Sequence, residues 1–169
     1  MRLHMKLHLK SKPIITGLAL VLLFSSLSFK CGGPPANDTD TRFRKAALAA
    51  DDVATGISQM INLKQKLGQD KKITAAEELA LTDLLLKVNT ADKVFVDQIK
   101  ALRAAGTLPD AGAKANLANL FNQVTSALSE LNSKGLLPLG NAGAKGQLVK
   151  ILATVSAAAN VIQAFFDKP

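Results

Sequence analysis

Apolar residues recur every three or four positions along most of the chain, which is the spacing of one face of an α-helix. Four stretches show this spacing. The first covers residues 41–67, and the second runs from Thr74 to Gly106. The third continues to Gly135, and the fourth ends at Phe166. Because no stretch alternates apolar and polar residues, the sequence predicts an all-α fold without a sheet.

Helix-capping residues support these boundaries. Thr74 and Glu77 have the spacing of a capping box, in which each side chain binds the backbone amide of the other residue. Gly68 and Gly106 stand where the C-terminus of a helix favours glycine. The expected inner face of the second helix holds Leu81, Leu84, Leu85, Val88, Ala91, Phe95, Ile99 and Leu102.

A short repeat precedes the third and fourth helices. Residues 108–114 read LPDAGAK and residues 141–145 read NAGAK, and a leucine follows each copy three residues later. Asp110 and Asn141 stand at the N-cap positions. The glycines lack the spacing of a phosphate-binding loop, so we interpret the repeat as two similar helix starts rather than a ligand loop.

Connections of only a few residues separate the helices, so successive helices must fold back beside each other. The sequence therefore predicts an up-down-up-down four-helix bundle in a domain of residues 41–169. Alanine is abundant on the apolar faces of the first and fourth helices. Small side chains allow close helix packing but bury little area each, so the larger residues are expected to supply most of the hydrophobic stabilisation.

The first 30 residues have the organisation of a secretory signal. Five basic and no acidic side chains occur in this segment, with an apolar core at residues 14–24 and a short serine-rich end. About 11 apolar residues are too few for a comfortable membrane span. Residues 1–30 are therefore expected to direct export and to be removed.

Cys31 is the only cysteine in the chain. It lies directly after this segment and is followed by two glycines and two prolines. The first 35 residues resemble a bacterial lipoprotein precursor, in which a peptidase cuts before a cysteine that is then acylated. The resemblance implies that Cys31 becomes the first mature residue and carries a lipid such as palmitate. It implies a lipid-anchored protein of the cell envelope, and Gly32 favours the outer membrane if the cell has one.

Two other outcomes of processing stay open. Leu27 stands one position earlier than in the lipoprotein pattern, and Lys30 replaces a small residue. Ser26 and Ser28 form a small-x-small site, at which ordinary cleavage would give a secreted or periplasmic protein with a free thiol. The third outcome is an uncleaved N-terminal anchor. In each case the polar residues 31–40 are expected to form a tether.

Charge and composition argue against a nucleic-acid partner. The chain has a net charge of +8, but residues 31–169 hold 16 basic and 13 acidic side chains, which leaves only +3. The chain has no Trp or Tyr for base stacking.

The fourth helix could be read as a membrane segment, yet Lys150, Asn160 and Gln163 would be costly in lipid. An apolar face packed between two neighbouring helices is the simpler interpretation.

Residues suited to catalysis are scarce. His4 and His8 are the only histidines, and both lie in the segment expected to be removed. A Ser-His-Asp arrangement and an imidazole zinc ligand are therefore excluded from the mature chain. The remaining candidates are the carboxylate pairs Asp51 with Asp52, Glu77 with Glu78, and Asp92 with Asp97. We interpret them as solvated helix faces or helix starts and expect no enzyme activity, cofactor or metal.

Two hypotheses about function remain. The first is a non-enzymatic envelope lipoprotein whose bundle is a structural or protein-interaction module held at a membrane. The alternative is a carrier that holds an apolar ligand, such as a lipid, between its helices. An internal cavity would favour the carrier, whereas a tight core with exposed apolar residues would favour the interaction module.

Overall fold

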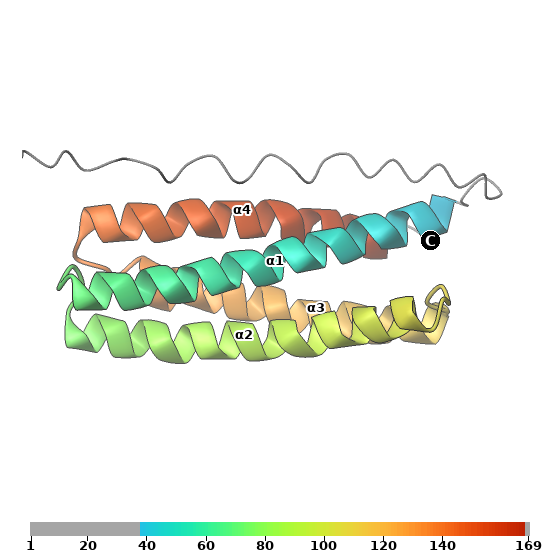
Figure 1. Cartoon of the computed structure of the whole chain (residues 1–169), viewed down its shortest axis with the longest axis horizontal. Coiled ribbons are helices and arrows are strands. Elements are labelled where there is room, and N and C mark those ends of the chain that lie inside the picture. The colour runs from blue at the N-terminus through green and yellow to red at the C-terminus, as the bar shows by residue number, and fades with distance from the viewer. Residues whose placement is uncertain (1–37, 168–169) are drawn as a thin grey trace, which may run out of the picture. The chain divides into compact units, whose positions relative to one another are not determined.

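The computed structural model describes residues 38–167, which form an all-α bundle (Figure 1). Its elements are α1 (Asp38–Gln69), α2 (Ala75–Ala104), α3 (Ala111–Glu130), the π-helical segment η1 (Leu131–Leu136) and α4 (Ala142–Phe166). The described residues contain no strand. The predicted all-α, up-down-up-down four-helix bundle is confirmed.

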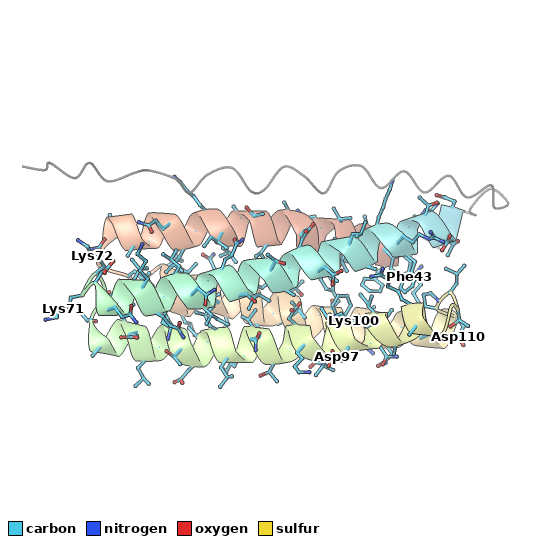
Figure 2. The ribbon with its side chains drawn as sticks, viewed as in Figure 1. Phe43, Lys71, Lys72, Asp97, Lys100 and Asp110 are labelled. Carbon is cyan, nitrogen blue, oxygen red and sulfur yellow. The ribbon has the colours of Figure 1, made fainter. Side chains whose placement is uncertain are left out.

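The four helices do not contact one another equally. α1 packs against both α2 and α4, and α2 packs against α3, whereas α3 and α4 touch only lightly. Successive helices run in opposite directions, so α1 begins and α4 ends at the same end of the bundle (Figure 1). There the Phe43 and Phe165 rings lie 5.8 Å apart between centroids. Figure 2 shows Lys71 and Lys72 at the opposite end.

A continuous hydrophobic core fills the space between the helices. Its largest fully buried side chains are Phe95, Phe121, Ile57, Met60, Leu81, Leu117, Leu131, Leu136, Leu148 and Ile162. The Phe121 ring bridges two others, since its centroid lies 5.3 Å from that of Phe95 and 5.8 Å from that of Phe166. These aromatic contacts join α2, α3 and α4 where α3 and α4 otherwise meet little.

The predicted helix starts are confirmed by their hydrogen bonds. The Glu77 amide donates to Thr74 Oγ1 at 3.2 Å, and the Thr74 amide donates to the Glu77 carboxylate at 2.7 Å. Asp110 accepts from the Ala113 amide at 2.7 Å, and Asn141 accepts from the Ala144 amide at 2.9 Å. The two copies of the repeat are therefore equivalent N-caps.

Two boundaries of α1 differ from the prediction. The helix already includes Asp38, three residues before the predicted start at residue 41, and Asp38 and Asp40 lie near its positive end. Asp38 also pairs with Arg42, and Asp40 pairs with Arg44 at 3.0 Å. Residues 38–40 thus belong to the helix and not to the predicted tether. At its other end α1 continues through Gly68 to Gln69.

The third predicted helix changes its geometry before Gly135. α3 ends at Glu130, and η1 carries the chain through one wider turn, in which the Leu137 amide donates to Asn132 O at 3.0 Å. Gly135 was expected to terminate the helix, but it lies buried inside η1. A Cβ atom at this position would lie 2.9 Å from Leu84 Cδ1, so glycine allows η1 to approach α2 closely.

Gly135→Ala is therefore expected to destabilise the bundle by about 1–2 kcal/mol, because the added methyl overpacks a filled core. Gly146→Ala is the matched control, since no atom lies within 4 Å of its added Cβ. That substitution within α4 should stabilise the protein by about 0.5–1 kcal/mol. Denaturant unfolding of the two variants measures both effects. Stabilisation by both substitutions would contradict the packing role of Gly135.

Candidate functional site

Some sequence-predicted residues lie outside the described part of the chain. Cys31, the expected lipidation site, is one of them, and His4 and His8 are two others. Among residues 38–167, no group of three or more histidine, cysteine or acidic side chains is placed to hold a metal ion. The candidate carboxylates all fall within the described helices and can be placed one by one.

The Glu77 carboxylate links two parts of the bundle. Besides its bonds to Thr74, it accepts a hydrogen bond from the Gly140 amide at 2.8 Å, just before α4. The Gly140 bond, followed by the bonds from Thr74, holds the pKa of Glu77 below its usual value. Glu77 therefore stabilises the start of α2, and its interpretation as a helix-start residue is confirmed.

Three other candidates lie on solvated faces, as expected. Asp52 is exposed, and Asp51 lies 3.9 Å from the Arg103 guanidinium. Asp97 accepts a hydrogen bond from Lys93 at 2.9 Å, and this bond lowers the pKa of Asp97. Asp51 and Asp52 are consecutive residues of α1, whereas Asp97 belongs to α2 and pairs with Lys93 of its own helix.

Asp92 corrects the sequence-based interpretation. Its side chain was expected in solvent, but the residue is only 3% exposed, and Oδ1 has no hydrogen-bond partner among the described residues. Burial raises the pKa of Asp92 to about 7, with Lys100 opposing the rise and Asp51 adding to it. The periodicity could have revealed this position, since Asp92 follows Val88 by four residues and precedes Phe95 by three on the buried face.

Lys64 is a second buried polar residue that the sequence analysis missed. Its ammonium group donates to Thr82 Oγ1 at 3.0 Å and lies 4.0 Å from a Glu78 oxygen. The Thr82 hydroxyl in turn donates to the Glu78 carbonyl at 2.7 Å. Lys64 thus has partners across the α1–α2 contact, in contrast to Asp92.

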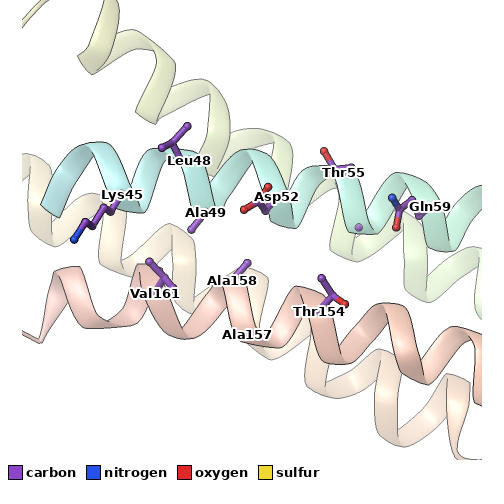
Figure 3. Close-up of a pocket in the computed structure, with 11 residues that line it drawn as sticks. Lys45, Leu48, Ala49, Asp52, Thr55, Gln59, Thr154, Ala157, Ala158 and Val161 are labelled. Atoms are coloured by element: carbon purple, nitrogen blue, oxygen red, sulfur yellow. The ribbon is translucent and has the colours of Figure 1, made fainter. Parts of the chain in front are cut away.

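A groove of about 650 Å³ runs along the surface between α1 and α4. Figure 3 shows Ala49 of α1 opposite Ala158 and Val161 of α4. Leu48 and Ala157 also line the groove. Its polar lining comes from Lys45, Asp52, Thr55, Gln59 and Thr154. The groove is open to solvent, and two of its lining residues, Ala49 and Gly56, are buried.

A second apolar feature lies on α2. Leu79, Leu86 and Val94 are 65%, 62% and 50% exposed and follow one another along one face of the helix; we call them the α2 ridge. A hollow of about 570 Å³ adjoins the ridge. Its lining residues are Asp83, Leu86, Lys87, Thr90, Ala91, Val94 and Gln123. The sequence analysis missed the ridge because these residues lie outside the main apolar stripe of α2.

Within the described residues, α4 is long and apolar enough to cross a membrane by length and composition, with a mean hydropathy of 1.6 over its most apolar window. Its inner side packs into the core through Leu148, Leu152, Val155 and Ile162. The packing is chiefly against α1, with lighter contacts to η1 and α3. These contacts cover part of its apolar surface, since 33% of that window is buried in the bundle.

Comparisons with protein-family models, with curated proteins and with solved structures found no match to this chain.

Proposed function

We propose that the chain is a membrane-anchored lipoprotein of the cell envelope, with a helical bundle that serves as a non-enzymatic structural or protein-interaction module. The anchor is the lipid on Cys31, directly after the export segment. The described bundle begins only seven residues later, at Asp38. Seven extended residues span at most about 25 Å, so the tether keeps the bundle close to the membrane.

The α2 ridge is the observation that carries the interaction role. Three large apolar side chains remain exposed on one helix face, although the core beneath them is filled. Removing such residues from water against a partner would stabilise a complex at about 25 cal/mol per Å² of apolar area. Three of the candidate carboxylates already have partners. The Glu77 carboxylate caps α2, and ion pairs engage Asp51 and Asp97. These contacts support a non-enzymatic role.

Cys31→Ala is expected to release the protein from the membrane fraction, because the lipid is the proposed anchor. The unsubstituted full-length chain should be acylated and should begin at Cys31 in the mature form. Cell fractionation, labelling with a tagged fatty acid and intact-mass measurement together test this prediction.

The control for this experiment is Ser26→Leu, which blocks the small-x-small site but leaves residues 27–31 unchanged. It should leave membrane association unchanged. If Cys31→Ala stays in the membrane fraction with Lys30 still attached, the lipoprotein assignment is wrong. If cleavage instead falls after Ser28 and the protein is released unmodified, ordinary secretion is correct.

The α1–α4 groove favours a carrier as the second candidate function. Its apolar lining of leucine, valine and alanines could cover a hydrocarbon chain on one side. A lipid that copurifies in a one-to-one ratio and is lost in Ala158→Lys would support the carrier. Copurification that does not depend on this substitution would count against the groove as its site.

A further inference from the structure

The apolar residues of the α2 ridge are spaced almost symmetrically about Leu86 along the helix. Leu79 and Val94 lie seven and eight residues from Leu86, which places them about 11 Å to either side of it along the axis. Asp83 and Thr90 lie between them, at three and four residues from Leu86. Reversal about the midpoint between Leu86 and Lys87 therefore exchanges Leu79 with Val94, Asp83 with Thr90, and Leu86 with Lys87.

The polar groups within this pattern are available for a partner. Among the described residues, Asp83 makes no hydrogen bond or ion pair, and the Thr90 hydroxyl is likewise without a hydrogen bond. The Thr82 hydroxyl, by contrast, donates to the Glu78 carbonyl of its own helix. One acceptor and one donor thus stand at exchangeable positions.

The same surface carries both projecting side chains and a recess. Leu86 and Val94 project beside the hollow, and the small side chain of Ala91 lines it. An interface between two identical copies related by a two-fold axis needs this combination, because each copy must offer both the projection and the recess.

We infer that the α2 ridge pairs with the ridge of a second copy of this chain, with the two α2 helices antiparallel. Leu86 lies near the two-fold axis, and Leu79 contacts Val94 of the partner subunit. Asp83 accepts a hydrogen bond from Thr90 of the partner subunit. This inference rests on the proposed role of the bundle as an interaction module.

Charge selects the antiparallel arrangement over the parallel one. In a parallel pair, Asp83 would face Asp83 of the partner subunit, and like charges at one level repel. The antiparallel pair replaces that repulsion with a carboxylate–hydroxyl contact. Because α1 begins at one end of the bundle, the two Asp38 residues then lie at opposite ends of the dimer. Both tethers reach one membrane when the paired bundles lie along its surface.

The size of the ridge predicts a weak dimer. From Leu79 to Val94 the ridge is about 22 Å long, which places the contact at the low end of protein interface sizes. Confinement at a membrane raises the effective concentration of the copies and favours pairing. Disulfide cross-linking is therefore the appropriate measurement, because it captures a weak dimer covalently.

Leu86→Cys in the full-length chain is expected to form a disulfide-linked dimer under mild oxidation, seen on a non-reducing gel. Leu137→Cys is the matched control, since Leu137 is 54% exposed but lies at the end of η1. The unsubstituted chain controls for Cys31. We expect at least a fivefold larger dimer fraction for Leu86→Cys than for either control.

Orientation is tested by coexpressing Leu79→Cys with Val94→Cys, one of them carrying a tag that changes its size. The mixed dimer should form, whereas neither variant alone should cross-link above the level of the unsubstituted chain. Self-cross-linking of Leu79→Cys would overturn the antiparallel pairing. The proposed dimer is wrong if Leu86→Cys cross-links no more than Leu137→Cys while it remains helical and in the membrane fraction. Loss from the membrane fraction in the unsubstituted chain would instead contradict the proposed anchor.

Discussion

Phe95→Ala should lower the free energy of unfolding by about 3–5 kcal/mol. The ring is 1% exposed, and its centroid lies 5.3 Å from that of Phe121 on α3. Truncation removes the transfer energy of the ring, leaves a cavity in the core and breaks the aromatic contact between α2 and α3. Urea unfolding followed by far-ultraviolet circular dichroism measures this loss.

Lys87→Ala is the control on the same helix. Its side chain is exposed, and its ion pair with Glu130, at 3.3 Å, is reached by water. Exposed ion pairs contribute little, so this substitution should change stability only slightly. If Phe95→Ala and Lys87→Ala have equal effects, the assignment of the buried face of α2 is wrong.

Asp92→Asn should make the bundle less sensitive to pH, with its largest gain in stability above neutral pH. The folded protein raises the pKa of Asp92 to about 7, chiefly because the carboxyl is buried. An unfolded chain has an Asp pKa of about 3.9, so the folded state retains a proton that the unfolded state releases between these values. The stability due to the protonated form is fully present below about pH 4 and is lost as pH rises to about 7.

The expected loss across this window is about 3–4 kcal/mol, and it should be absent in the Asn variant. Unfolding measured at about pH 4 and pH 8 spans this window and gives the difference between the two proteins. Asp52→Asn, which alters an exposed carboxylate on α1, should follow the unsubstituted protein at both pH values. Parallel pH profiles for Asp92→Asn and the unsubstituted protein would show that Asp92 is not buried as described.

The two experiments also bear on the proposed dimer. Phe95 and Asp92 face the bundle core, whereas Leu86 and Val94 face solvent on the same helix. Phe95→Ala and Asp92→Asn should change stability, in opposite directions above neutral pH, without a specific effect on cross-linking when the protein remains folded. Substitutions in the α2 ridge should instead change cross-linking with little effect on stability, because the ridge residues contribute little to the core.

Local patterns in the sequence were sufficient for the architecture. The three- and four-residue spacing of apolar side chains gave four helices, and short connections required them to fold back on one another. The starts at Thr74, Asp110 and Asn141 were predictable because a cap depends on hydrogen bonds within three residues. Cys31 and the export segment remain predictions, since they lie outside the described residues.

Tertiary packing decided the features that local patterns do not encode. Whether Asp92 is solvated depends on which neighbouring helices cover it, and whether Gly135 ends a helix or fits against Leu84 depends on how closely two helices approach. The exposure of Leu86 has the same cause, because a hydrophobic side chain is buried only where another element reaches it. The amino-acid sequence by itself therefore determined the helices and their order, while the contacts between helices decided which side chains remain available for a partner.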